Sequence, residues 1–168
     1  MPTPWTLLVY RIPSQPSKLR LNVWRKLASL GALYLQDAVC VLPSRPDTDD
    51  AFRDVYRTIV ESGGSGFLFE SKILEPADEE QVVEGFRKLS DDRLTTIQGR
   101  LDATLEMLSG KVGLADLEVA EESLKRERVA YLRAQSISYM GGTKEAEVES
   151  RLRRLQQSLD SIRDAILG

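Results

Sequence analysis

The first 75 residues alternate between short apolar stretches and longer amphipathic ones. The short stretches are rich in β-branched and aromatic side chains and stop at Pro, Gly or polar residues, which is typical of strands. They cover residues 5–12, 32–36, 38–42 and 66–74. The second and third of these, on either side of Asp37, are also compatible with one bent strand.

Two longer stretches, residues 17–30 and 46–61, have apolar residues at every third or fourth position, which predicts amphipathic helices. The resulting order β-α-β-β-α-β is that of the ferredoxin-like split motif. We therefore expect an α+β domain of this type over residues 1–75, with four antiparallel strands and both helices on one face of the sheet.

After Pro76 the spacing is helical, and it predicts an α-helical extension over residues 76–168 that packs on the first domain as a bundle or hairpin. The last helix has the clearest pattern, because its apolar residues alternate steps of four and three, as in a heptad repeat. This heptad seam comprises Val148, Leu152, Leu155, Leu159, Ile162 and Ile166. A seam of this kind needs a partner helix, and we expect an earlier helix of the same chain, with a second subunit as the alternative.

The composition, with 42% hydrophobic and 29% charged residues, is that of a soluble globular protein. No apolar run approaches the roughly 18 residues that a membrane helix needs, and residues 1–6 lack the basic start and apolar middle of a signal peptide. We therefore expect a cytoplasmic protein without a membrane partner.

The charge is divided unevenly along the chain. Residues 1–45 contain six Lys or Arg and one acidic residue, whereas residues 46–168 contain seventeen Lys or Arg and twenty-five acidic residues. A basic first part can meet an anionic partner, and it can also simply attract the acidic remainder of the same fold.

The chain offers little for catalysis. A single cysteine, Cys40, and the absence of histidine exclude an intrachain disulfide, a cysteine-rich zinc site and a Ser-His or Cys-His nucleophile. The acidic residues at positions 47–54 fit a helix start better than a calcium loop, because the glycine and terminal glutamate of an EF-hand are missing. We expect no enzymatic activity, no metal site and no cofactor.

The helix predicted over residues 17–30 carries its cations on one side. With about 100° between successive residues, its polar side spans a sector of about 100° opposite the apolar one. The polar sector contains Lys18, Asn22, Arg25, Lys26 and Ser29, and the apolar face contains Leu19, Val23, Leu27 and Leu30. Cations arranged in this way can neutralise nucleic-acid phosphates, and Asn and Arg can also bind base edges. The alternative is a charged face that only keeps the helix soluble.

Residues 5–43, "WTLLVYRIPSQPSKLRLNVWRKLASLGALYLQDAVCVLP", resemble the N-terminal domain of the ChrB family, regulatory proteins of bacterial chromate resistance. The resemblance rests on a tryptophan-led strand, "YRIPSQPS", "VWRKL", "LGALYLQDAV" and a closing "LP", and it is weaker in the later "RERVAYLR" and the C-terminal helices. It implies a DNA-binding transcriptional regulator whose N-terminal half contacts the operator. By position, this contact falls on Lys18, Arg20, Arg25 and Lys26. Family members with both halves have a second domain implicated in sensing the oxyanion, and we expect that domain to be absent from this chain.

Pattern and resemblance together predict a non-enzymatic, DNA-associated regulatory module that forms a homodimer, because a two-fold arrangement presents two basic helices to neighbouring grooves. The candidate nucleic-acid-binding residues are Arg11, Lys18, Arg20, Asn22, Arg25 and Lys26. The alternative function is a protein-interaction module whose heptad helix docks a separately encoded sensor domain.

Overall fold

A computed structural model describes residues 3–14 and 17–168 of the chain. The chain forms two compact units, of which the first ends at Phe86 and the second runs from Arg87 to Gly168. No helix in the described parts of the chain is both long and apolar enough to cross a membrane.

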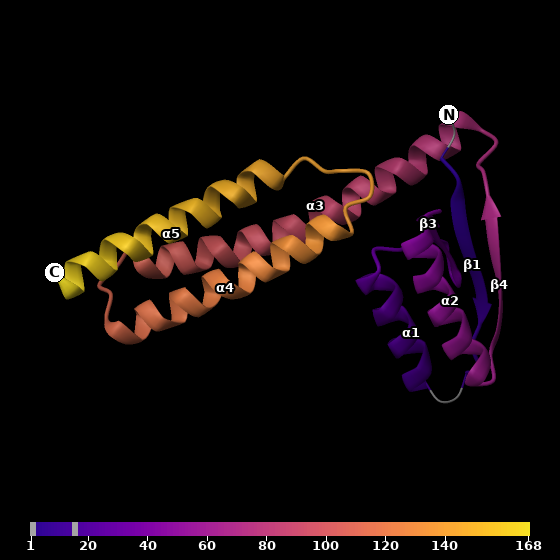
Figure 1. The fold of residues 1–168 in the computed structure, drawn as a ribbon, viewed down its shortest axis with the longest axis horizontal. Coiled ribbons are helices and arrows are strands. Elements are labelled where there is room, and N and C mark those ends of the chain that lie inside the picture. Colours follow the sequence, from indigo (N-terminus) through magenta and orange to yellow (C-terminus); the bar gives the residue numbers. More distant parts are fainter. Residues whose placement is uncertain (1–2, 15–16) are drawn as a thin grey trace. The chain divides into compact units, whose positions relative to one another are not determined.

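The first unit contains one four-stranded antiparallel sheet with the strand order β2-β3-β1-β4. Its strands are β1 (Trp5–Arg11), β2 (Leu33–Gln36), β3 (Val39–Pro43) and β4 (Ser65–Ser71). Helix α1 (Ser17–Ser29) connects β1 to β2, helix α2 (Pro46–Glu61) connects β3 to β4, and both lie on the same side of the sheet (Figure 1). The predicted mixture of helices with four antiparallel strands is confirmed.

The two faces of the sheet bury different partners, because successive side chains of a strand point to opposite faces. Leu8 is buried on the face that α1 and α2 cover, together with Val23 and Leu27 of α1 and Phe52 of α2. On the other face, Trp5 stacks on Phe86 with ring centroids 5.6 Å apart. Phe86 belongs to helix α3 (Pro76–Leu108), so the first turns of this helix form part of the first unit.

Two tight turns fix the connections of the sheet. The turn between β2 and β3 places Ala38 at a φ of 59°, a left-handed conformation that few residues other than glycine adopt. After α2, a Cβ on Gly64 would lie 2.6 Å from the carbonyl oxygen of Arg11 and 2.8 Å from the Cγ2 of Ile59. Only glycine lets the chain pass this close to the end of β1.

The second unit consists of α3 from Arg87 onward, α4 (Leu114–Ser136) and α5 (Glu145–Leu167), which run side by side (Figure 1). Apolar residues of all three helices form one core. The core residues are Leu94, Ile97, Leu101, Leu108, Leu117, Ala120, Leu124, Tyr131, Ala134, Val148, Leu155 and Leu159.

The heptad seam of α5 contributes to this core. Val148, Leu155 and Leu159 are buried, Leu152 and Ile162 pack partly buried against the same core, and Ile166 remains 42% exposed. The helices of the same chain therefore cover most of the seam. A separate protein would have to displace α3 or α4 to reach these side chains.

A fully buried carboxylate also links two of the helices. Glu127 of α4 has no exposed surface, and both of its oxygens accept hydrogen bonds from Arg100 of α3, at 2.8 and 3.0 Å. Arg126 adds a third hydrogen bond at 3.3 Å. A buried charge is tolerated only when it is paired and hydrogen-bonded, so Glu127 requires its arginine partner.

Candidate nucleic-acid interface

The cation face of α1 follows from helical geometry. Val23 and Leu27 are buried against the sheet, and Leu19 and Leu30 are half-buried on the same side. The opposite side is therefore turned to solvent. The exposed polar residues on it are Lys18, Asn22, Arg25, Lys26 and Ser29.

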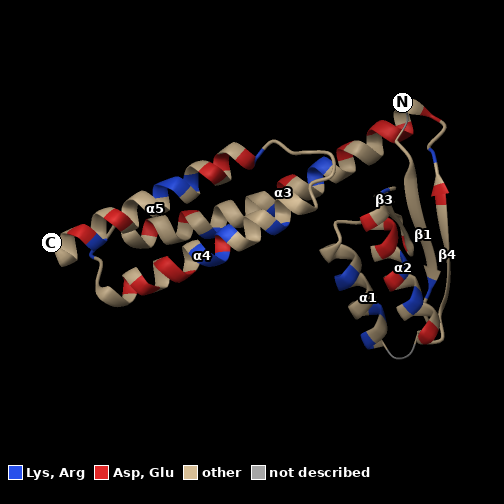
Figure 2. Cartoon of the chain, viewed as in Figure 1, with Lys and Arg blue, Asp and Glu red and all other residues tan. Residues whose placement is uncertain are grey.

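The cations of α1 have no acidic partner in the described chain. Helix α1 contains no acidic residue, and within residues 3–14 and 17–168 no carboxylate lies within ion-pairing distance of Lys18, Arg25 or Lys26. Figure 2 shows the contrast between α1, whose charged residues are all basic, and α2, where basic and acidic residues are mixed. Within the described residues of the first unit, the acidic side chains therefore do not pair with this face.

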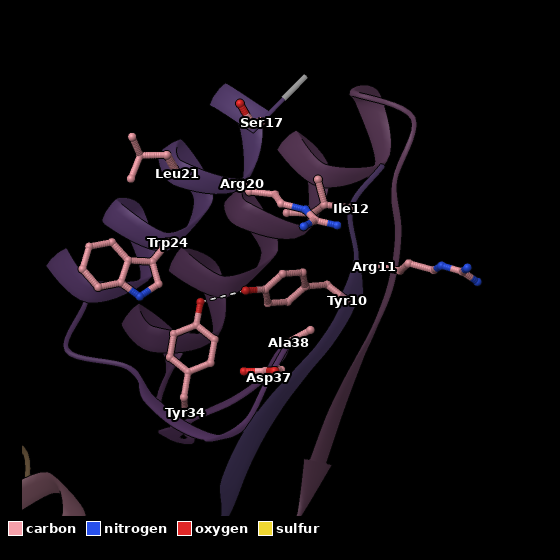
Figure 3. Close-up of a pocket in the computed structure, with 10 residues that line it drawn as sticks. All are labelled: Tyr10, Arg11, Ile12, Ser17, Arg20, Leu21, Trp24, Tyr34, Asp37 and Ala38. Atoms are coloured by element: carbon pink, nitrogen blue, oxygen red, sulfur yellow. Dashed lines mark hydrogen bonds between the residues drawn. The ribbon is translucent and has the colours of Figure 1, made fainter. Parts of the chain in front are cut away.

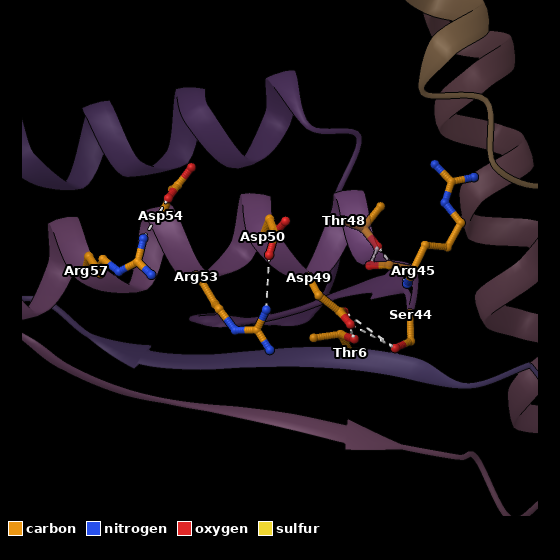
Figure 4. Close-up of polar contacts among 9 residues, drawn as sticks. All are labelled: Thr6, Ser44, Arg45, Thr48, Asp49, Asp50, Arg53, Asp54 and Arg57. Carbon is orange, nitrogen blue, oxygen red and sulfur yellow. Dashed lines mark hydrogen bonds and ion pairs between the residues drawn. The ribbon is translucent and has the colours of Figure 1, made fainter.

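The acidic residues at positions 47–54, in the first half of α2, form ion pairs and hydrogen bonds within the first unit (Figure 4). Asp50 pairs with Arg53 at 3.1 Å, and Asp54 pairs with Arg57 at 3.0 Å. Asp47 pairs with Arg45 at 2.9 Å, and Asp49 accepts hydrogen bonds from the hydroxyls of Thr6 and Ser44. The hydrogen bonds from Arg45 lower the pKa of Asp47. Within the described ranges, no group of three His, Cys, Asp or Glu side chains is placed to hold a metal ion.

Arg20 and Arg11 do not belong to the row of exposed polar residues on α1, and they lie apart from each other. Arg20 extends from α1 toward Ile12, whereas the side chain of Arg11 extends away from α1 (Figure 3). The reason is the alternation of β1, which turns Tyr10 toward the helices and Arg11 toward the opposite face of the sheet. Arg20 is thus part of α1 but lies beside its exposed polar residues, whereas Arg11 lies on the other face of the sheet.

A pocket of about 960 Å³ adjoins the basic helix. Its lining comes from α1, from the end of β1, from β2 and from the β2–β3 turn (Figure 3). The lining includes Arg20, Leu21, Trp24, Tyr10, Tyr34 and Asp37. Trp24 is 55% exposed, so its indole presents a large apolar surface beside the cations.

The floor of this pocket contains a tyrosine pair. The hydroxyls of Tyr10 and Tyr34 are 2.7 Å apart and share a hydrogen bond. Burial raises the pKa of both phenols, and in Tyr34 the hydrogen bond with Tyr10 raises it further. Both side chains are therefore neutral at physiological pH, and the pair has one hydroxyl proton left to donate.

The pocket contains the residues that sequence analysis missed. Tyr10 comes from β1, whereas Tyr34 and Asp37 come from β2 and the turn after it, and no spacing along the chain joins Tyr10 to the other two. Only Tyr10 could have been assigned to this pocket from the sequence, because the alternation of side chains along β1 places it on the face that α1 covers.

Cys40 is a buried core residue. It has no exposed surface, and its Sγ lies 3.9 Å from the carbonyl oxygen of Leu8. Burial raises the pKa of the thiol from 9.0 to about 12, so the reactive thiolate is suppressed at neutral pH.

This shift predicts a loss of stability at alkaline pH. Below pH 9 the thiol is protonated in both the folded and the unfolded chain, and above it the unfolded chain ionises first, which favours unfolding up to the folded pKa of about 12. Between pH 9 and pH 10, the free energy of unfolding should fall by about 1 kcal/mol more in the natural chain than in Cys40→Ala. Urea denaturation at both values measures this difference, and parallel losses in the two proteins would show that Cys40 ionises normally.

Comparison with known proteins identifies relatives of the chain. Residues 20–167 match the family model described as Protein ChrB, N-terminal. The chain is also 29% identical over 119 residues to Protein ChrB of Cupriavidus metallidurans (strain ATCC 43123 / DSM 2839 / NBRC 102507 / CH34), an alignment that covers 71% of this chain and 34% of that protein. The chain thus spans about a third of the length of this curated relative. No solved structure matches it.

Proposed function

The chain belongs to the ChrB family through its N-terminal domain, and from this premise we propose that it is a DNA-associated, non-enzymatic regulatory module of the chromate-resistance type. It acts as a homodimer, and α1 is the element that contacts DNA. The observation that carries this proposal is the row of exposed cations on α1 without an acidic partner in the described chain.

Unpaired cations favour a polyanionic partner for a physical reason. A cation that already pairs with a carboxylate must break that pair to bind a phosphate, whereas Lys18, Arg25 and Lys26 have no such pair to break within the described residues. Each cation that neutralises a phosphate releases condensed counterions, which gives a favourable, salt-dependent contribution to affinity. The basic side of α1 is therefore better suited to DNA than the mixed surface of α2.

Two further side chains on the same helix can add sequence preference. Asn22 lies in the exposed sector between Lys18 and Lys26, and an amide there can make two hydrogen bonds to adenine. Arg25 can make two hydrogen bonds to guanine. Lys18, Lys26 and Arg20 then position the helix on the phosphate backbone.

The direct test replaces Lys18, Arg25 and Lys26 together by alanine. We expect the affinity for duplex DNA from upstream of the gene to fall by about 100-fold or more at moderate salt, because two phosphate contacts and one base contact are lost. A gel-shift titration measures the change. The matched control replaces Lys125, Arg133 and Arg153, three exposed cations of the second unit, and removes the same charge. Unchanged binding by the α1 variant, or an equal loss in the control, would refute the assignment to α1.

The arrangement of the first unit supports a second part of the proposal, which concerns its fold type. We propose that it is a ferredoxin-like split β-α-β domain. The support is the element order β-α-β-β-α-β, the strand order β2-β3-β1-β4 and the position of α1 and α2 on one face.

The alternative function, a module that docks a separate sensor domain through α5, has weaker support. Five of its six seam residues pack in the core of the same chain, and the sixth, Ile166, is a single exposed side chain near the end of the helix. The exposed cations of α1, in contrast, are available without any rearrangement.

A further inference from the structure

The two edges of the sheet in the first unit are built differently. At one edge, β2 is four residues long and its pairing with β3 is interrupted by a bulge between Tyr34 and Gln36. Short strands and bulges are devices that protect a sheet edge from pairing with other chains. At the other edge, β4 pairs with β1 over all seven residues without interruption, and it contains neither proline nor lysine. Within the described chain, the charge of Glu70 is the single protective feature of this second edge.

Exposed aromatic side chains lie along the same edge. Phe67 is 65% exposed and Phe69 is 50% exposed, and their rings stack with centroids 6.0 Å apart. They pair in register with Val9 and Leu7 of β1, on the face of the sheet opposite to α1 and α2. An apolar pair of this size on an open strand edge indicates a protein-binding surface rather than an ordinary solvent-facing strand.

The direction of the free hydrogen-bonding groups on β4 follows from the ladder. The amide of Tyr10 donates to Ala38, and the carbonyl oxygen of Leu8 faces Cys40, so the even positions of β1 bond toward β3. The odd positions of β1 therefore bond toward β4, where their partners are Ser65, Phe67, Phe69 and Ser71. The backbone groups of the intervening residues, Gly66, Leu68 and Glu70, point to the free side.

We propose that β4 pairs with the β4 strand of a second copy of this chain, antiparallel and with the two-fold axis at Leu68. In this register, Leu68 pairs with the partner's Leu68, and Gly66 pairs with the partner's Glu70. These are the residues whose backbone groups the sheet leaves free, so every outward amide and carbonyl of the three central positions finds a partner. The two sheets join into one.

The side chains are self-complementary in the same register. Phe67 lies opposite the partner's Phe69. By symmetry this gives two aromatic cross-strand pairs, on the face of the sheet opposite to α1 and α2. Glu70 is the only charged residue in β4, and it lies opposite glycine rather than opposite its own copy. A shift of the axis to Phe69 would place it opposite the partner's Leu68, and a shift to Glu70 would set two like charges against each other. The register at Leu68 therefore satisfies hydrogen bonding, apolar contact and charge together.

This surface deepens the proposed function, because it names the interface of the homodimer that presents two α1 helices. It does not depend on DNA binding, and its test contains no DNA. Failure of the interface leaves the cations of α1 untouched, and failure of DNA binding by the α1 variant leaves the dimer unaffected.

The experiment measures the mass of the full chain in solution by light scattering after gel filtration at micromolar concentration. The natural chain should have twice its subunit mass of 18.9 kDa, whereas the double variant Phe67→Ser/Phe69→Ser should have the mass of one subunit. The control Leu114→Ser/Leu132→Ser changes two leucines of α4 that are 64% and 66% exposed, and it should remain dimeric. A second variant, Glu70→Pro, keeps both phenylalanines but removes an outward amide together with the carboxylate, and its dimer dissociation constant should rise at least tenfold.

Three results would overturn the proposal: a monomeric natural chain, a dimeric phenylalanine variant, or an equal loss of the dimer in the α4 control. Circular dichroism of each variant shows whether its helix content is retained. Since proline is tolerated on edge strands where the amide faces solvent, Glu70→Pro provides a test that does not alter the apolar surface.

Discussion

Replacing Arg100 with methionine is expected to lower the free energy of unfolding by about 3 kcal/mol. Arg100 binds both oxygens of Glu127, which has no exposed surface. Without it, Glu127 retains one longer hydrogen bond from Arg126, whose side chain is 63% exposed. The loss is large because a buried carboxylate is left without its main hydrogen-bond donor and neutralising charge.

Two controls separate this effect from a simple loss of packing. Arg126→Met removes only the longer contact, and it should cost less than about 1 kcal/mol because that side chain is mostly in solvent. The double variant Arg100→Met/Glu127→Met removes the buried charge with its partner, and its stability should return to within about 1 kcal/mol of the natural chain. Urea denaturation followed by circular dichroism measures all three. A double variant as unstable as Arg100→Met would show that the charge is not the cause.

The second large effect is expected at the heptad seam. Leu155→Ala should lower the free energy of unfolding by about 3 kcal/mol, because Leu155 is fully buried in the core of the second unit and its truncation leaves a cavity. Ile166→Ala, at the 42% exposed end of the same seam, should cost less than about 1 kcal/mol. The midpoints of urea denaturation compare the two variants directly.

The comparison distinguishes an internal seam from a docking surface. If α5 were held for an external partner, Leu155→Ala would leave the stability of the isolated chain nearly unchanged. A large loss at Leu155 with a small one at Ile166 follows only when α3 and α4 already cover the seam.

Local periodicity was sufficient to predict most elements of the fold. The strand and helix patterns of the first 75 residues gave the order β-α-β-β-α-β, and the steps of four and three in α5 predicted a seam that packs within the chain. The start of α3 shows where periodicity stops being informative. Its first turns belong to the unit of the sheet because Phe86 stacks on Trp5, a contact between residues far apart in sequence that a helical pattern does not reveal.

The residues of the candidate interface were likewise predictable only in part. The exposed face of α1 was predictable, because the positions of Lys18, Asn22, Arg25 and Lys26 around a helix depend only on their spacing. The pocket beside it was not, because Tyr10 and Tyr34 meet only after β1 and β2 take their places in the sheet. The edge position of β4 was equally hidden, since the order of strands in a sheet is a property of the whole domain.

If the cations of α1 contact phosphates, the affinity for DNA must fall as the salt concentration rises, and the steepness of that fall counts the contacts. For each phosphate contact, the logarithm of the binding constant falls by about 0.9 per decade of salt concentration. The slope of the natural chain should therefore be steeper by about 1.8 than that of the variant in which Lys18, Arg25 and Lys26 are alanine, because two of the three replaced cations, Lys18 and Lys26, contact phosphates. Equal slopes in the two proteins would mean that Lys18, Arg25 and Lys26 neutralise no phosphate and that α1 is not the DNA-binding element.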